Sequence, residues 1–457
     1  VVPLRPLATS WAFRPLSCNY EWARQMALAS LAKLAGSLAA AAAAAAVAIH
    51  NSGDGHLVLP KASVFSGALA LGGIAALTAL LQLPGKQAVA ADIASLRTVA
   101  LRLKDSIDHA RETLGSPPLS AADSYEAVRF LAETWTSWHE TRPTFQADEV
   151  QTVAGVQPLS AAEAEAMARH LPLALAAYEE DPSAAVEEEG LRLLYHDRTT
   201  VAGERTSHYL AYSTEQRRVV LGIQGTSDMN DVLTDAMCRA VPLSPRVRGG
   251  EVLAHEAMSV AARHLAARVG PLLRDLFTPS GRPYSIAVTG HSLGAGTACL
   301  LAVLLREDIG IDVVAFGFAT PPVIGKDAAL RCKPYILSVV HHTDVIPRAS
   351  LRNLLLLSRL MDAVLQLRQN QDEESAREGV VDAVKQVVSS AHETPTDLYV
   401  PGKVCYIFAD GEGDYHSAMH DGTLPMLATI MPSTTLLVDH LATAYATAVG
   451  AVQPNAH

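Results

Sequence analysis

A serine between two glycines is the feature of this chain whose residue types and spacing most clearly indicate chemistry. Residues 290–294 read Gly-His-Ser-Leu-Gly; the apolar residues 284–288 predict a strand before them, and the small residues 295–298 predict a helix start after them. In such a strand–turn–helix, called a nucleophile elbow, the sharp turn presents the serine hydroxyl at the edge of a sheet. Glycines leave room where a Cβ would strike a neighbouring element. The pattern therefore predicts Ser292 as the nucleophile of an acyl transfer.

A serine hydroxyl is a weak nucleophile, and it needs a base together with an acid that orients the base. Behind elbows of this kind the partners follow in the order Ser, Asp, His. Residues 336–340 predict a strand, and Asp344 lies just past its end, where such a sheet gathers its catalytic side chains. We therefore predict Asp344 as the acid, the alternative being an aspartate that only caps a turn or helix.

The histidine is less well determined by residue chemistry. The downstream candidates are His341, His342, His416, His420 and His440. The first two lie too close to Asp344 in the chain for the usual arrangement on separate loops. The next two lie in an acidic, glycine-containing loop, and His440 precedes a predicted helix at 441–449. Chemistry alone leaves His416, His420 and His440 open, because a loop histidine is often merely solvated or structural.

The oxyanion formed during acyl transfer needs backbone N–H donors, one from the elbow and one from the loop after an early strand. Residues 219–226 read as a buried strand that ends in a glycine-containing turn. We therefore predict that the amides of Thr226 and Leu293 form the oxyanion hole. Leu293 lies at the start of a predicted helix, whose dipole also favours an anion. The alternative for 219–226 is a plain strand end.

Composition limits the partners of the chain. The formal net charge of its 457 residues is −11, which argues against nucleic acid as a partner. The apolar share is 49% and the charged share only 18%, a balance that points to membrane contact. The five cysteines are scattered and indicate free thiols rather than a disulfide framework. No zinc or calcium spacing is present, so we expect no metal.

Two long apolar runs lie in the first fifth of the chain. Residues 26–49 are mostly alanine, whereas residues 63–83 are richer in larger apolar side chains and carry no charge. Both have the length of a membrane-spanning helix, and basic residues flank the pair, which predicts a hairpin with both ends and the catalytic domain on the cytoplasmic side of a membrane. The alternatives are an alanine-rich targeting sequence or helices packed on the domain.

The remaining pattern predicts a second, catalytic domain. The breaker Gly-Ser-Pro-Pro at 115–118 suggests a helical segment over 1–115 and a catalytic domain over 116–457. Strands are expected at 191–194, 208–213, 219–223, 286–288, 313–318, 336–340 and 404–408. Helices are expected at 121–141, 160–179, 254–276 and 295–306. Strands that alternate with helices predict a mostly parallel sheet with both faces covered.

Several of these segments together resemble a known family, the class 3 (fungal-type) lipases, and within it the sn-1-specific diacylglycerol lipase branch. The resemblance covers about residues 191–445 and rests on the elbow at 290–296, on Gln-Gly-Thr at 224–226, on Asp-Val-Ile-Pro-Arg at 344–348, and on Asp-His at 439–440 with Tyr445. Shorter similarities lie at 231–235, 255–258 and 399–403. The resemblance selects His440 over His416 and His420.

The resemblance implies an α/β-hydrolase fold with a mostly parallel central sheet, preceded here by a helical, partly hydrophobic N-terminal segment. It implies a serine hydrolase without cofactor that acts on glycerolipids, chiefly diacylglycerol or triacylglycerol, at a membrane or lipid-droplet surface. Ser292, Asp344 and His440 would form the triad. The alternatives are a phospholipase A1 or galactolipase on the same scaffold, and a catalytically inactive membrane-bound scaffold protein.

The chain also departs from the family pattern. Gln224 replaces an arginine, which puts the rigidity of the oxyanion loop in question, and Ala257 replaces a glycine at a helix start. At most two spans are expected, where animal diacylglycerol lipases have four. Residues 351–395 resemble the regulatory insertion of the branch, and we interpret them as a mobile flap over the site or as a plain helical hairpin. Residues 246–250 are a second possible lid hinge.

Overall fold

The computed structural model describes most of the predicted catalytic domain. The residues described are 104, 107–108, 111–112, 117–140, 155–201, 205–225, 239–244, 251–277, 284–390, 398–410, 413–420, 424, 427, 429–430, 433 and 435–452. All of them lie in the second of the two units into which the chain divides, residues 80–457. The apolar runs 26–49 and 63–83, Thr226, the segment 231–235 and the hinge 246–250 lie outside the described residues.

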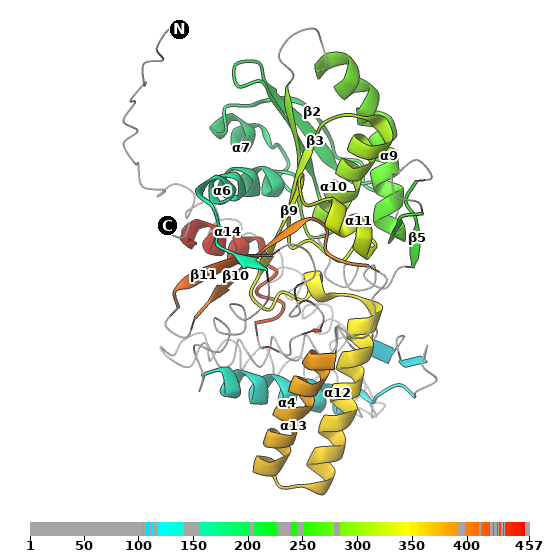
Figure 1. The fold of residues 1–457 in the computed structure, drawn as a ribbon, viewed down its shortest axis with the longest axis vertical. Helices are drawn as coiled ribbons and strands as arrows, with labels where there is room; N and C mark the ends of the chain where they lie inside the picture. The colour runs from blue at the N-terminus through cyan, green and yellow to red at the C-terminus, as the bar shows by residue number, and fades with distance from the viewer. Residues whose placement is uncertain are drawn as a thin grey trace, which may run out of the picture. The chain divides into compact units, whose positions relative to one another are not determined.

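A nine-stranded sheet forms the centre of the described region, in the order β1-β11-β10-β9-β8-β7-β4-β3-β2 (Figure 1). Its five middle strands run parallel and are β4 (Arg218–Ile223), β7 (Ser285–His291), β8 (Val314–Phe318), β9 (Ile336–His341) and β10 (Lys403–Ala409). Antiparallel strands complete its two sides: β2 (Arg192–Asp197), β3 (His208–Ser213), β11 (Tyr415–His420) and β1 (Val156–Gln157). A separate two-stranded sheet pairs β5 (Ala240–Pro242) with β6 (Leu253–His255).

Helices cover both faces of this sheet because its middle strands are apolar on both sides. On one face, α9 (Glu256–Phe277) and α10 (Leu293–Val303) share a core with Val219, Leu221 and Val288. On the other, α6 (Ala161–Ala176) and α14 (Ala442–Ala451) share a core with Val339 and Cys405. The short helices α7 (Ser183–Glu188) and α11 (Lys326–Arg331) complete the layers. The expected α/β-hydrolase-like fold is confirmed.

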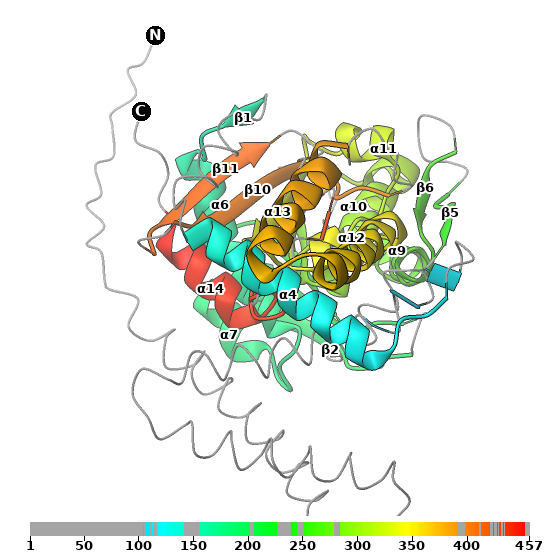
Figure 2. The ribbon, with the colours of Figure 1, turned by 90° about the horizontal axis from the view of Figure 1, so that it is seen from below.

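Three further helices form a bundle below the sheet in Figure 1. Figure 2 shows the same bundle from below. They are α4 (Ala121–Glu140), α12 (Leu351–Asn370) and α13 (Glu373–Ser390). Their buried apolar side chains form one cluster that also contains Val345, Ile346 and Leu436, with Leu293 packed against it. The bundle therefore packs directly on the residues that follow Ser292 and Asp344 in the chain.

Phe130 on α4 joins the two helices of the insertion. Its ring lies between two guanidinium groups, with Arg368 of α12 at 4.8 Å and Arg377 of α13 at 4.9 Å from the ring centroid. Glu126 of α4 forms an ion pair with Arg368, and Glu133 lies 3.8 Å from Arg377. Cation–π and ionic contacts thus hold the α12–α13 hairpin on α4.

Residues before α4 contact the same hairpin. The guanidinium of Arg111 donates to the hydroxyl of Ser358 (2.7 Å) and to the carboxylate of Asp362 (2.9 Å), both on α12. Ile107 belongs to the same buried cluster. The insertion predicted at 351–395 is therefore a helical hairpin over 351–390 that packs against chain from both sides of the breaker at 115–118.

Most of the expected elements are found, with differences at their ends. The helix expected at 295–306 begins at Leu293, ends at Val303 and continues as a π-helical turn, Leu304–Ile309, that stops at Gly310 with φ of 82°. The expectation that His416 and His420 lie in an acidic loop is wrong, because both histidines lie on β11. This strand has a polar sequence, and it is defined by its pairing with β10 on one side and with the short β1 on the other. Within the described residues, no helix combines the length and the apolar character needed to cross a bilayer.

Candidate active site

Three parallel strands bring the predicted site to one edge of the sheet. Ser292 follows β7, Asp344 lies three residues beyond β9, and Gly225 lies two residues beyond β4. The carboxyl ends of parallel strands meet at a single edge, which is where sheets of this type bind ligands. The strand order places β8 between β7 and β9.

The backbone of Ser292 has the strained geometry of an elbow, with φ of 59° and ψ of −130°. A non-glycine residue held in such a region costs on the order of 1–3 kcal/mol. Two contacts hold it there: its N–H donates to the carbonyl of Phe318 (2.9 Å), and its carbonyl accepts from the N–H of Ala295 (2.9 Å). Ser292 is 1% exposed, and within the described part of the chain its Oγ has no hydrogen-bond partner.

The two glycines of the elbow are required by close backbone packing. A Cβ on Gly290 would lie 2.5 Å from the carbonyl carbon of Gly294. A Cβ on Gly294 would lie 2.4 Å from the carbonyl oxygen of Ile223 and 2.7 Å from the amide nitrogen of Gly225. The elbow therefore packs against itself and against the end of β4 with no space for a side chain, as its sequence predicts.

His440 contacts Asp344 directly. Its Nδ1 lies 3.0 Å from one carboxylate oxygen of Asp344 and 3.2 Å from the other. The carboxylate also accepts from the hydroxyl of Tyr445 (2.7 Å) and the N–H of Ile346 (2.9 Å), and Asp344 is fully buried. Burial alone would raise the pKa of Asp344, but the charge of His440 and these hydrogen bonds outweigh it and hold the pKa below its ordinary value.

His291, the residue before the nucleophile, connects the elbow to His440. Its Nε2–H donates to the backbone carbonyl of His440 (3.1 Å), and the two ring centroids are 4.9 Å apart. Burial, together with the charge of His440, lowers the pKa of His291 to about 3, so this imidazole is neutral at ordinary pH. The structure thus brings the segments of Ser292, Asp344 and His440 together, and their catalytic roles stay predictions.

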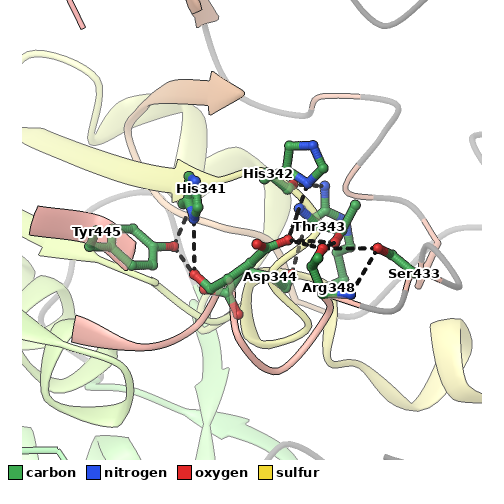
Figure 3. Close-up of polar contacts among 9 residues, drawn as sticks. His341, His342, Thr343, Asp344, Arg348, Ser433 and Tyr445 are labelled. Carbon is green, nitrogen blue, oxygen red and sulfur yellow. Dashed lines mark hydrogen bonds and ion pairs between the residues drawn. The ribbon is translucent and has the colours of Figure 1, made fainter. Parts of the chain in front are cut away.

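A second carboxylate, that of Asp439, ties the histidine segment to the aspartate segment, whose residues His342, Thr343 and Asp344 are labelled in Figure 3. One oxygen of Asp439 accepts from His342 Nδ1 (3.1 Å), from the N–H (3.0 Å) and hydroxyl (2.6 Å) of Thr343, and from the hydroxyl of Thr435 (2.9 Å). Burial raises the pKa of Asp439, but its contacts with His342 and Thr343 outweigh this, and the pKa lies below its ordinary value. This network fixes the residue that precedes His440.

Arg348 holds the turn that carries Asp344. Its guanidinium is fully buried and donates to the backbone carbonyls of Asp344 (2.7 Å) and His342 (2.9 Å). The same turn begins with His342 in the left-handed region, at φ of 41°. The sequence motifs contain Arg348, Asp439 and Tyr445, but residue patterns alone did not predict that they support the turn.

Two of the other histidine candidates have other partners. Nδ1 of His341 contacts the backbone carbonyl of Asp439 (3.1 Å). His416 lies on β11, with Nε2 2.7 Å from the carboxylate of Asp410. Of the candidates, it is therefore His440 that contacts Asp344. The signal that finds it is the Asp-His pair before a helix, and residue chemistry alone could not rank it.

Comparison with known proteins bears on the same region. Residues 220–354 match the family Lipase (class 3). This segment, which carries Ser292 and Asp344, is similar to the class 3 lipases. Mouse diacylglycerol lipase-beta is 33% identical over 139 residues, 30% of this chain and 20% of that protein. Human diacylglycerol lipase-alpha is 31% identical over 169 residues, 35% of this chain and 16% of that protein. The match thus spans a fifth or less of these relatives, and it confirms the resemblance to this branch.

Solved lipase structures are also similar to this chain. The native Rhizomucor miehei lipase propeptide complex has a TM-score of 0.45 at 18% identity, over 63% of this chain and 81% of that one. A lipase from Rhizopus microsporus var. chinensis has a TM-score of 0.44 at 16% identity, over 63% and 90%.

Within residues 220–354, the start of the predicted oxyanion loop is held on both sides. Gln224 donates its N–H to the carbonyl of Ser207 (2.9 Å), and its carbonyl accepts from the hydroxyl of Thr206 (2.6 Å). Gly225 donates its N–H to the hydroxyl of Tyr178 (3.1 Å). Backbone contacts therefore fix Gln224 where the family has an arginine.

Leu293, the other predicted oxyanion donor, is the first residue of α10. An amide at this position has no partner within its own helix and points toward the helix N-terminus. Among the described residues, no group of three or more His, Cys, Asp or Glu side chains is arranged to hold a metal ion.

Proposed function

We propose that this chain is a serine hydrolase that cleaves acyl ester bonds of glycerolipids, with diacylglycerol and triacylglycerol as its substrate class. The observation that carries the proposal is the hydrogen bond from His440 to the fully buried carboxylate of Asp344, next to an elbow that bears Ser292 in strained geometry. The similarity to diacylglycerol lipases supports the substrate class.

The mechanism follows from this arrangement. Asp344 accepts the Nδ1–H of His440, which leaves Nε2 free to act as a base. His440 takes the proton of Ser292, and the hydroxyl oxygen attacks the ester carbonyl. The amides of Thr226 and Leu293 stabilise the oxyanion, His440 gives its proton to the leaving alcohol, and a water molecule then hydrolyses the acyl-enzyme. Every proton transfer in this cycle is carried by His440, so no cofactor is required.

The replacement Ser292→Ala tests the nucleophile. It should abolish hydrolysis of a short acyl ester and labelling by a fluorophosphonate, because both need the same hydroxyl. Ser338→Ala is a matched control: Ser338 is also buried, and its hydroxyl donates to the carbonyl of Pro401 (2.8 Å), away from the elbow. Turnover that survives Ser292→Ala would refute the assignment, and a wild type that neither reacts nor is labelled would favour the inactive scaffold protein.

The lipid class is tested with mixed substrates. The wild-type chain is incubated with vesicles that contain diacylglycerol, triacylglycerol, phospholipid and galactolipid, and the products are identified. Free fatty acid with monoacylglycerol supports the proposal. Lysophospholipid or lysogalactolipid as the main product would instead assign a phospholipase A1 or galactolipase, because the head group is chosen by loops rather than by the elbow.

We also propose that the chain acts at a membrane or lipid-droplet surface, with its catalytic domain on the cytoplasmic side. The apolar runs 26–49 and 63–83 and their basic flanks support this arrangement. Protease treatment of sealed vesicles that carry the full chain is the test. Digestion of residues 116–457 from the cytoplasmic side supports the orientation, and their protection contradicts it.

A further inference from the structure

Tyr178 connects the start of the oxyanion loop to the elbow. It lies two residues beyond the end of α6, and its hydroxyl has two backbone partners. The hydroxyl accepts from the N–H of Gly225 (3.1 Å) and donates to the carbonyl of His291 (3.2 Å). One side chain thus bridges the residue before Thr226 and the residue before Ser292.

The space around this hydroxyl is filled. A Cβ on Gly225 would lie 2.5 Å from the Tyr178 hydroxyl, 2.6 Å from the carbonyl oxygen of His291 and 3.1 Å from the amide nitrogen of Gly294. The tyrosine oxygen therefore occupies the corner where the end of β4 meets the elbow. Removing it leaves the Gly225 N–H and the His291 carbonyl without this partner.

The end of α6 that carries Tyr178 is itself anchored to the sheet. The hydroxyl of Tyr209 on β3 donates to the carbonyl of Leu173 (2.6 Å). The hydroxyl of Thr289 on β7 shares its proton between the carbonyls of Phe316 (2.9 Å) and His170 (3.3 Å). The rings of Tyr178 and His291 meet edge to face, 6.2 Å apart. Because α6 is fixed to the two strands that flank β4, the position of the Tyr178 hydroxyl is set by the sheet.

We propose that Tyr178 is a positioning residue for the proposed oxyanion hole: its hydroxyl fixes the spacing between Gly225 at the end of β4 and the elbow, which carries Ser292 and the donor amide of Leu293. This inference rests on the proposed function. Oxyanion donors stabilise the transition state only when they lie at about 2.7–3.1 Å from the developing charge. A small shift of one donor should therefore slow the chemical step more than it weakens substrate binding.

The protonation of Tyr178 suits this role. Burial raises the pKa of its hydroxyl above the ordinary value, so the O–H remains available to donate to His291 at neutral and mildly alkaline pH. The bridge requires that proton, because a phenolate could accept from Gly225 but could not donate to a carbonyl.

The test is Tyr178→Phe, which keeps the ring and removes only the bridge. We expect kcat for a short ester to fall about tenfold, the usual effect of one net hydrogen bond, while KM changes less than about twofold. The affinity for a boronic acid that mimics the tetrahedral oxyanion should fall by a similar factor. Amide hydrogen exchange in the peptide that contains Gly225 should become faster.

Tyr335→Phe is the matched control. Tyr335 is also buried, and its hydroxyl donates to the carboxylate of Glu307 (2.8 Å). Tyr335 lies just before the first residue of β9, at the end of the strands opposite to the elbow. This control should affect stability without changing kcat or the exchange near Gly225. An unchanged kcat, or unchanged exchange, in Tyr178→Phe would overturn the proposal.

The two hypotheses fail in different ways. A wild type without esterase activity contradicts the proposed function, and hydrogen exchange at Gly225 then still decides whether Tyr178 holds this loop. An active wild type whose kcat does not depend on the Tyr178 hydroxyl contradicts the positioning role alone.

Discussion

Nδ1 of His440 lies 3.0 Å from the carboxylate of Asp344, across 96 positions of sequence. The contact is buried, since Asp344 is fully buried and His440 is 5% exposed. The aspartate is further fixed by Tyr445 and by the N–H of Ile346. An imidazole held in this way has its tautomer defined, which is what a serine nucleophile requires of its base.

Asp344→Asn should reduce kcat for ester hydrolysis by roughly 10⁴-fold, because an amide at this position favours the wrong tautomer of His440. The measurement is steady-state hydrolysis of a short acyl ester. Asp410→Asn is the control, since Asp410 contacts His416 on the β11 side of the sheet. If the Asp410 variant lost activity and the Asp344 variant kept it, His416 rather than His440 would be the base.

Stability should fall in acid through two carboxylates. The folded-state pKa values of Asp344 and Asp439 lie below the ordinary range, so their contribution is fully present above the unfolded pKa of about 3.9. It is lost as the pH falls from there through the folded values. Urea unfolding between pH 3 and 6 should show this loss, with a shallower pH dependence in Asp439→Asn. An identical slope would contradict the linkage; the exposed Asp382 provides the control, Asp382→Asn.

Gly294→Ala should abolish activity and destabilise the fold, since the new Cβ would lie 2.4 Å from the carbonyl oxygen of Ile223. Gly450→Ala is the matched control on α14, where a Cβ meets nothing within 4 Å and no positive φ is imposed. That control should be neutral or more stable by about 0.4–1 kcal/mol. Thermal unfolding and ester turnover of both variants are measured, and a well-folded, active Gly294 variant would disprove the close packing.

Phe130→Ala should loosen the α12–α13 hairpin, because it removes the ring between Arg368 and Arg377. Loss of a buried phenylalanine costs about 3–5 kcal/mol, and here the cost falls on the helical bundle. Limited proteolysis should cut residues 351–390 faster than in the wild type. Leu351→Ala, at an exposed position of α12, serves as the control, and equal cleavage in all three proteins would argue against the clamp.

Several strands could be predicted from sequence because each is a short apolar run with a turn after it. β3 was predicted with its observed bounds, and β4, β9 and β10 differ by a residue or so at their ends. β11 could not be predicted, since its polar residues alternate weakly and the strand depends on pairing with β10. Local patterns therefore describe apolar strands better than a polar strand such as β11.

The triad candidates could be predicted from order and motif, whereas their supports could not. Asp439 binds Thr343 and Thr435, and these contacts depend on how two loops meet. Ser292, Ala319 and His342 have positive φ at the ends of three neighbouring strands, although none is a glycine. Tertiary contacts impose these conformations, so they cannot be predicted from the backbone preferences of the residues.

The 1% exposure of Ser292 has a kinetic consequence. In the proposed reaction an ester carbonyl must reach this hydroxyl, so the groups that cover Ser292 have to move before the bond can form. Leu293 packs on the cluster formed by α4, α12 and α13. The helices α12 and α13, which follow Asp344, contact Phe130 on α4, a helix that precedes residues 220–354 in the chain. A movement of Leu293, the residue after Ser292, therefore disturbs packing with a helical bundle whose own contacts lie far from Ser292 in sequence.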